Sequence, residues 1–141
     1  MPRAVVDTNV FVSAFLFHDR GGVPVELLHR LAEGRFTLVL CRALLEELTD
    51  VLTRDPSVGE RYGYTPEMVA LYLTTLEAHA DFAEPPMPVA PISRDPSDDI
   101  VVATAVTADA PYVVTGDNDL LSLGTYESVS IVTPRQFLDL L

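Results

Sequence analysis

Hydrophobic residues follow two patterns along the chain, and each predicts a different kind of secondary structure. Short continuous apolar runs between turn-forming residues are typical of buried strands, whereas apolar residues spaced three or four positions apart are typical of amphipathic helices. The continuous runs predict strands over residues 3–7, 36–40, 112–115 and 129–132, and a short strand at one end of the proline-rich segment 81–91.

The helical spacing predicts helices over residues 9–16, 23–33, 42–53, 65–79 and 134–141, with loops over 17–22 and 55–64. Proline in the first turn of several of these segments, and Gly34 just after the second, are typical helix boundaries. The helix over 65–79 is expected to begin after a Thr65 cap and to carry its apolar residues on one side, which are Met68, Leu71, Tyr72 and Leu76.

Residues 100–108 are ambiguous because their β-branched side chains would also suit a strand. A buried helix is favoured for two reasons. Ser97 or Asp98 can cap it, and the following segment 112–115 makes a better strand. Thr133 is expected to cap the last helix in the same way.

Strands that alternate with helices predict parallel β-α-β units. We therefore expect an α/β fold, a three-layer α/β/α sandwich around a central, mostly parallel sheet of four or five strands, in one domain over residues 1–141. In such sheets ligands bind beyond the carboxyl ends of the strands. The residues that follow each strand are therefore the ones to inspect for chemistry.

The composition is that of a globular domain, since 48% of the 141 residues are hydrophobic and 21% are charged. No apolar run reaches the length of about 18 residues that a membrane span needs, and the first residues lack the apolar segment of a signal peptide. We therefore expect a cytoplasmic protein. Cys41 has no second cysteine to pair with and is expected to be a small buried residue.

The charge limits how this protein could meet a nucleic acid. Its net charge is −12, and all nine basic residues are arginine. Such a chain cannot form a broad basic face, so contact with nucleic acid would depend on bound cations and a few arginines. The candidates for phosphate contact are Arg20, Arg42, Arg54, Arg61 and Arg94, although most arginines are expected to pair with nearby acids.

Acidic residues follow two of the predicted strands. Asp7 closes the first strand, and Asp117 comes two residues after Thr115 at the end of another. Because the carboxyl ends of parallel strands meet at one edge of a sheet, both carboxylates are expected at that edge. A helix cap at Asp7 and a simple turn at Asp117 would explain the same residues without chemistry.

A third acid comes from the helix over 42–53. At about 100° per residue, the leucines of this helix and Val51 form one apolar arc. Glu47 lies at the border of this arc, whereas Glu46 faces solvent. A carboxylate at the border of a buried face can point into a cleft. A surface acid whose stem lies along the helix is the ordinary alternative.

The segment RDPSDD, residues 94–99, places three aspartates within five positions, directly before the apolar residues 100–105. Repulsion between neighbouring carboxylates raises their free energy, so such a cluster persists where a cation, a proton or a functional demand compensates it. A solvated turn that leads into a helix is the alternative reading of this segment.

Together these acids predict a metal site. The candidates are Asp7, Glu47, Asp98 or Asp99, and Asp117 or Asp119. No lysine is present to neutralise them, so a divalent cation is the simplest compensation. Carboxylate and water ligands suit Mg²⁺ or Mn²⁺, which polarise phosphoryl oxygens and lower the pKa of bound water. This chemistry points to phosphodiester hydrolysis.

Five segments, in this order, resemble the successive motifs of PIN-domain ribonucleases: VVDTN (5–9), LEEL (45–48), DPSDD (95–99), VTGDNDL (114–120) and IVTPRQFL (131–138). The resemblance extends from end to end of the chain, except that residues 55–92 match no motif. It is strongest to the VapC-like toxins of toxin–antitoxin systems. It implies a metal-dependent endoribonuclease that a cognate antitoxin keeps inactive.

The resemblance also implies roles for individual residues. The four metal-binding and catalytic acids would be Asp7, Glu47, Asp98 and Asp117. Asp119 would be an auxiliary acid, and Thr8, Asn9 and Thr115 would orient the carboxylates through hydrogen bonds. The family motif has one key aspartate before its apolar helix. Asp98 is favoured by the register of residues 100–105, Asp99 is second, and a share for Asp95 stays open.

The resemblance further implies cleavage of RNA by metal-activated water, with 5′-phosphate and 3′-hydroxyl products and no need for a histidine. The implied partners are the RNA substrate, a small basic antitoxin bound in an apolar groove with an acidic floor, and a second copy of the chain in a homodimer. The helix that contains Tyr72 and Leu76 is expected to offer an apolar surface.

Three other functions are compatible with parts of this pattern. A catalytically silent PIN-like binding module stays open, since the presence of all four acids argues only mildly against it. A metal-dependent phosphatase of the haloacid-dehalogenase type would have a second aspartate where Asn9 stands, together with a lysine. A response-regulator receiver also uses a lysine, so the absence of lysine disfavours both.

Overall fold

The structure is a computed structural model that describes residues 1–141 and contains one six-stranded sheet. The strands are β1 (Arg3–Val6), β2 (Thr37–Leu40), β3 (Ala80–Phe82), β4 (Tyr112–Val114), β5 (Thr125–Tyr126) and β6 (Val129–Val132). Their order in the sheet is β3-β2-β1-β4-β6-β5. All neighbouring pairs are parallel except β5 with β6. The α/β class and the mostly parallel sheet are confirmed, but the sheet has six strands rather than four or five.

The helices are α1 (Thr8–Leu16), α2 (Val23–Ala32), α3 (Arg42–Thr53), α4 (Pro56–Tyr62), α5 (Pro66–Ala78), α6 (Pro96–Thr107), α7 (Asn118–Leu121) and α8 (Pro134–Leu140). Two of them differ from expectation, because α4 and α7 fall where a loop and a turn were expected. Each is short and begins at an aspartate whose side chain accepts a backbone N–H, Asp55 for α4 and Asp117 for α7. A side-chain cap of this kind supports a helix too short to have a clear apolar period.

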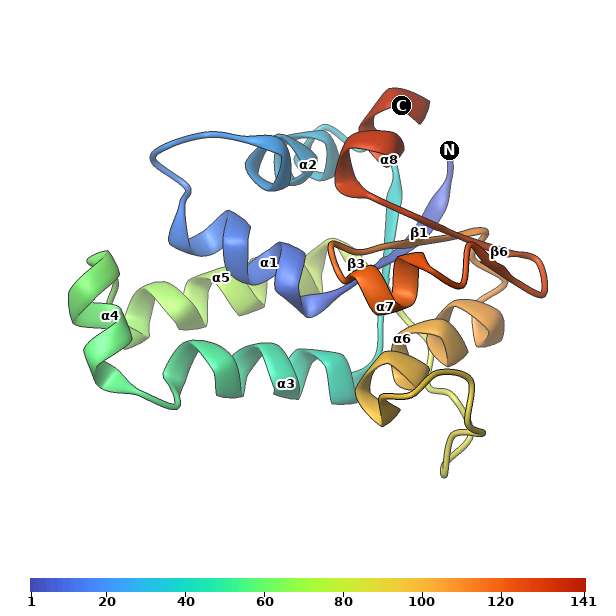
Figure 1. The fold of residues 1–141 in the computed structure, drawn as a ribbon. Helices are drawn as coiled ribbons and strands as arrows, with labels where there is room; N and C mark the ends of the chain where they lie inside the picture. The colour runs from blue at the N-terminus through green and yellow to red at the C-terminus, as the bar shows by residue number, and fades with distance from the viewer.

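Helices cover both faces of the sheet, which gives the three layers (Figure 1). Successive residues of a strand point to opposite faces. On one face, Ala4 and Val6 of β1 pack with α1, α2, α3, α5 and α8. On the other face, Val5 packs with α6, α7 and the first turn of α3. Both faces are buried, so the strands are continuous apolar runs, as parallel strands covered on two sides require.

Residues 100–107 of the ambiguous segment lie in helix α6, as favoured, and Ala108 is its C-cap, but the N-cap is neither Ser97 nor Asp98. The Asp95 side chain accepts the N–H of Ser97 at 2.9 Å, and Pro96 occupies the first helical position. Proline is well placed there because the first N–H groups of a helix lack partners inside it. Asp98 therefore lies within the first turn of α6, where its carboxylate is not used as a cap.

Helix α5 packs through only two of the four apolar residues expected on one side, Tyr72 and Leu76, together with Val69. Val69 and Leu76 are buried, whereas Met68 and Leu71 are exposed, Leu71 by 69%. Tyr72 is half-buried, and its hydroxyl donates a hydrogen bond to the carbonyl of Phe11 at 2.8 Å. Tyr72 and Leu76 therefore pack within this chain, and the apolar surface of α5 is made by Met68 and Leu71.

None of the helices is both long enough and apolar enough to span a lipid bilayer. The last helix instead closes the core of the domain. Phe137 of α8 is fully buried, and its ring packs edge-on against Phe36 at 5.1 Å and against Tyr112 at 5.6 Å between ring centres. The cap expected at Thr133 is present, as part of a capping box with Gln136.

We predict that Phe137→Ala lowers the free energy of unfolding by about 3–5 kcal/mol, because it removes a buried aromatic ring and leaves a cavity. Leu140→Ala, on the same helix but 54% exposed, is the matched control and should change stability by much less. Urea unfolding followed by circular dichroism measures both. Equal losses for the two variants would show that α8 does not close the core as described.

Candidate functional site

The site is built where β1 and β4 end side by side. The two strands are paired in parallel with Val6 opposite Val114, so Asp7 and Thr115 leave the sheet at the same edge. The N–H of Asp7 donates to the carbonyl of Val114 at 2.8 Å, which extends the pairing by one residue. Asp7 stands at the cap position of α1, but its carboxylate makes no cap hydrogen bond and is only 7% exposed.

Thr115 joins the two strand ends. Its fully buried hydroxyl donates to Oδ2 of Asp7 at 2.8 Å and accepts the N–H of Asp117 at 3.0 Å. Thr8 adds a longer contact from its hydroxyl to Oδ1 of Asp7 at 3.5 Å. The side chain of Asp7 is therefore oriented by neighbouring hydroxyls and has few alternative positions.

Glu47 approaches the same edge from α3. Glu46 is exposed and Glu47 is half-buried, as the helical geometry predicts. Val51, expected on the apolar arc of this helix, is 37% exposed, so the buried arc consists of the leucines alone. Burial raises the pKa of Glu47, and the negative charge of Asp7 raises it further. This influence of Asp7 indicates that the two carboxylates are neighbours.

Asp98, in the first turn of α6, is the most perturbed acid. It is 7% exposed, and its burial raises its pKa to about 7, with further upward contributions from the charges of Asp117, Asp95 and Asp7. Burial also raises the pKa of Asp7. The hydrogen bond from Thr115 opposes this rise, and the negative charge of Asp117 increases it. Each shift has the sign expected for carboxylates that are buried near one another.

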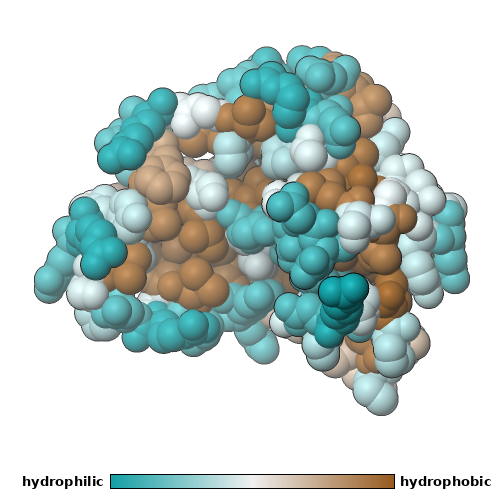
Figure 2. Space-filling view, in the orientation of Figure 1, coloured by the Kyte–Doolittle hydropathy of each residue, from teal (hydrophilic) through white to brown (hydrophobic).

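Figure 1 shows α1, α3, α6 and α7 coming together at this edge of the sheet, and Figure 2 shows hydrophilic residues gathered at the centre of the same face. The acids that influence one another there are Asp7, Glu47, Asp95, Asp98 and Asp117. None of them forms an ion pair with an arginine or a histidine. The cluster is therefore left without protein cations.

The other candidate residues lie differently. Asp99 is buried, but its Oδ1 accepts both the N–H and the hydroxyl of Ser93, at 2.6 and 2.8 Å. It therefore anchors the segment before α6. Asp119 is exposed, and its N–H donates to the carboxylate of Asp117. Asn9 is exposed and makes no side-chain hydrogen bond.

Sequence reasoning did not identify two features of this site. One is Ser93, because a serine in a proline-rich segment carries no motif. The other is the combined use of Asp95, which caps α6 and also adds its charge to the cluster. The crowding of aspartates in RDPSDD was the signal available for Asp95, but position along the chain alone does not separate a cap from a ligand.

The donor set fits a hard divalent cation. It consists of carboxylates, with threonine hydroxyls behind them, and contains no thiol or imidazole. As placed, no three Asp, Glu, His or Cys side chains converge into a complete binding group. Mg²⁺ does not require such a group, because it usually keeps several waters and binds through one or two protein carboxylates together with substrate phosphates.

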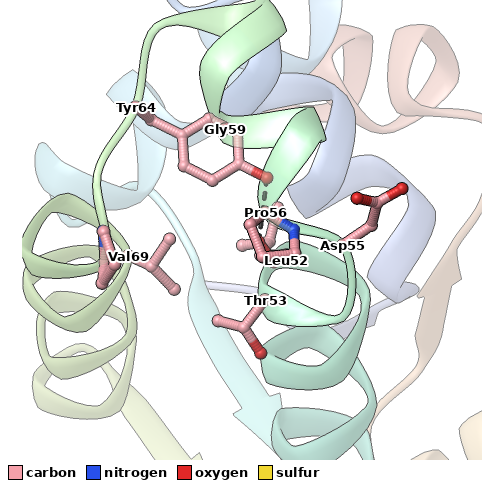
Figure 3. A pocket seen from close by; sticks show the side chains of 8 residues that line it. Leu52, Thr53, Asp55, Pro56, Gly59, Tyr64 and Val69 are labelled. Carbon is pink, nitrogen blue, oxygen red and sulfur yellow. Dashed lines mark hydrogen bonds between the residues drawn. The ribbon is translucent and has the colours of Figure 1, made fainter.

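Two other hollows differ in character from the acidic cluster. A cavity of about 160 Å³ lies where α3 ends and α4 and α5 begin, and the hydroxyl of Tyr64 donates there to the carbonyl of Leu52 (Figure 3). A larger, mainly apolar groove of about 530 Å³ lies between α1, α2 and α5 and includes Phe15, Leu28 and Leu71. Neither hollow contains the cluster acids.

Comparison with known proteins identifies the family. A family model for the PIN domain matches residues 3–119, a range that includes Asp7, Glu47, Asp98 and Asp117. The chain belongs to the PIN domain family. No curated protein matches its sequence.

The fold is shared with a solved structure as well. VapBC2 from Rickettsia felis, solved bound to a DNA fragment from its promoter, matches with a TM-score of 0.61 over 93% of this chain and 98% of that one. The two sequences are 13% identical, so this likeness is one of fold. It agrees with the PIN-like arrangement of sheet and helices described above.

The raised pKa of Asp98 predicts how stability depends on pH without metal. Between the usual aspartate pKa of 3.8 and about 7, the folded protein binds more protons at this residue than the unfolded chain does. Asp98 therefore stabilises the fold at low pH, and this contribution is lost as the pH rises towards and through 7. Asp7 and Glu47 act in the same direction.

In EDTA, we expect Asp98→Asn to raise the melting temperature at pH 8 by several degrees and to flatten its fall between pH 5 and 8. Thermal denaturation at both pH values measures this. Asp139→Asn, at an exposed residue of α8, is the control and should keep the wild-type slope. An unchanged slope in Asp98→Asn would contradict the raised pKa of Asp98.

Proposed function

We propose that this PIN-domain protein is a metal-dependent endoribonuclease and the toxin of a toxin–antitoxin pair. One observation carries the proposal: five carboxylates influence one another at the carboxyl edge of the sheet, and none of them forms an ion pair with a protein cation. The PIN family match and the fold shared with a VapBC protein support the same conclusion. We also expect the protein to act in the cytoplasm.

Asp7, Glu47, Asp98 and Asp117 would hold Mg²⁺ or Mn²⁺. When bound, the cation would polarise the scissile phosphate and lower the pKa of the attacking water. Asp7 and Asp98 are the two most buried of these acids, so they gain most from a neighbouring positive charge. Glu47 and Asp117 are half-buried and can therefore also contact water and substrate.

The remaining residues would keep this arrangement in place. Thr115 fixes one oxygen of Asp7 and the backbone of Asp117 with a single hydroxyl, and Thr8 contacts the other oxygen of Asp7. Hydrogen bonds to metal-binding carboxylates fix the orientation of those carboxylates and increase the affinity for the metal. Asp119 stays an auxiliary acid in this proposal, whereas Asp99 is assigned to the loop that it anchors.

We predict that Asp7→Asn and Asp98→Asn each reduce the rate of RNA cleavage at least about 100-fold. Removal of one group that stabilises charge in a transition state typically lowers kcat by about that factor. Cleavage of a pool of structured cellular RNAs by antitoxin-free protein, with Mg²⁺, Mn²⁺ or EDTA, measures this. The products should carry 5′-phosphate and 3′-hydroxyl ends.

Helix α3 offers a matched pair for this experiment. Glu47→Gln should lose cleavage, whereas Glu46→Gln, one residue away and exposed, should keep it. Full activity in folded Asp7→Asn protein would contradict the site. A wild type that binds RNA and metal but does not cut would instead support the rival function, a catalytically silent binding module.

We further propose that an antitoxin segment occupies the apolar groove between α1, α2 and α5. Its volume of about 530 Å³ and its lining by Phe15, Leu28 and Leu71 suit apolar side chains, and the net charge of −12 suits a basic partner. The groove contains no carboxylate, so the acidic floor expected from the sequence is not part of it. A homodimer is also expected, through a surface outside this groove, because Met68 and Leu71, the exposed apolar residues of α5, line the groove itself.

The groove is tested by a charge placed within it. Tagged wild type purified from its host should carry a small basic protein, and Leu71→Arg should lose most of it, because a buried guanidinium without a partner is costly. Leu140→Arg, at an exposed leucine of α8, is the control and should retain the partner. Retention by Leu71→Arg would place the partner elsewhere on the surface.

A further inference from the structure

We infer that Arg94 binds a backbone phosphate of the RNA, one that neighbours the scissile phosphate at the acidic cluster. The inference rests on the proposed function and assigns one contact within it. Arginine is the only strongly basic side chain in this acidic protein, because the sequence contains no lysine.

Three of the five candidate arginines make other contacts. Arg42 pairs with Glu77 and stacks over the ring of Phe82, and Arg54 pairs with Asp50 on the same helix. Arg20 lies over the ring of Phe17. A guanidinium already committed to an acid or a ring is less available to a ligand.

Arg94 and Arg61 make no ion pair, ring contact or side-chain hydrogen bond, and both are exposed. Only their surroundings differ. Arg61 lies in α4, whereas Arg94 directly precedes Asp95, whose charge reaches both Glu47 and Asp98. Arg94 is thus the free arginine placed next to the cluster.

A hollow of about 290 Å³ adjoins the cluster, and Arg94 lines it together with Ser93, Asp119 and Ser122. Asp119 connects the hollow to the cluster, because its N–H is bound by the carboxylate of Asp117 at 2.9 Å. Four of its six lining residues are polar, and they combine one arginine with two serine hydroxyls and the exposed carboxylate of Asp119. A guanidinium and hydroxyl donors are the groups that bind phosphate oxygens in proteins.

The backbone on both sides of Arg94 is fixed. Ser93 is held by the carboxylate of Asp99 through its N–H and its hydroxyl, at 2.6 and 2.8 Å. Asp95 is held as the cap of α6 through Ser97. Anchors on both neighbours limit the positions that Arg94 can reach, so less freedom is lost when it binds a ligand. The buried Asp99 has a purpose in this arrangement, since it holds the segment that carries Arg94.

The charge balance favours a phosphodiester as the ligand of Arg94. An acidic peptide would be repelled by the cluster beside the hollow and by the net charge of the chain. A nucleic acid strand whose scissile phosphate is held at the cluster presents further phosphates at regular spacing. Arg94 can neutralise one of these without competing for the ligands of the cation.

The test uses binding and kinetics together. In an Asp7→Asn background, which keeps RNA uncut, we expect Arg94→Ala to weaken binding of a fluorescein-labelled random RNA oligonucleotide pool about tenfold in Mg²⁺. The slope of log affinity against log salt should fall by about one, as for loss of one phosphate contact. In the wild-type background, KM should rise while kcat changes little, and Arg94→Lys should recover part of the affinity because it keeps the charge.

Arg61→Ala is the matched control, since it removes another free exposed arginine and should leave affinity and salt slope unchanged. Equal loss of affinity in Arg94→Ala and Arg61→Ala would overturn the inference, because it would reflect net charge alone. Unchanged binding in Arg94→Ala would also overturn it. If wild-type protein cleaves but Arg94→Ala matches it in every respect, the inference fails and the nuclease stands. If wild-type protein does not cleave, the nuclease fails, and the binding arm still decides on Arg94.

Discussion

The parallel pairing of β1 with β4 is the constraint on which the rest of the site depends. It sets Asp7 beside Thr115, and the hydroxyl of Thr115 then fixes both the carboxylate of Asp7 and the start of the turn that carries Asp117. Asp98 and Glu47 are added by α6 and α3, which pack on the same sheet. Carboxylates that repel one another are therefore held together by a hydrophobic core that contains none of them. The burial of apolar side chains in that core offsets the free-energy cost of the repulsion.

The distribution of charge gives this cluster its chemical meaning. The chain has 21 acids and nine arginines. The ion pairs that its arginines form lie at the surface. At the edge of the sheet, however, no arginine forms an ion pair with the cluster acids. The pKa of Asp98 rises to about 7 there, which marks a site with negative charge in excess. Perturbed acids of this kind gather at functional sites because function, rather than stability, maintains them.

Much of the fold could be predicted from the sequence because its elements have strong local signals. The bounds of α3 and of β6 match prediction, since each is a clear apolar period or run. The two-residue strand β5 and the short helices α4 and α7 could not be predicted, because so few residues show no period. The apolar side expected for α5 holds for Tyr72 and Leu76 but not for Leu71, because helical spacing alone does not distinguish Leu71 from Val69 and the packing of neighbouring helices decides which is covered.

The candidate site, like the fold, has features that the sequence predicts and features that it does not. Strand ends, helix geometry and resemblance to the PIN family indicate Asp7, Glu47, Asp98 and Asp117 from the sequence. Their mutual influence in the structure depends on contacts between distant segments, which the sheet topology sets. The different tasks of Asp95, Asp98 and Asp99 were beyond the sequence. One turn of helix separates a cap, a cluster acid and a loop anchor, and only the positions of Ser97 and Ser93 distinguish them.

The central claim is that the cluster exists to hold a divalent cation, and a calorimetric titration of Mn²⁺ at pH 8 tests it most directly. Wild-type protein should bind Mn²⁺, and Asp98→Asn should weaken that binding by a factor of ten or more, while Asp139→Asn leaves it unchanged. Binding that is absent from the wild type, or that is equally strong in Asp98→Asn, would contradict the account.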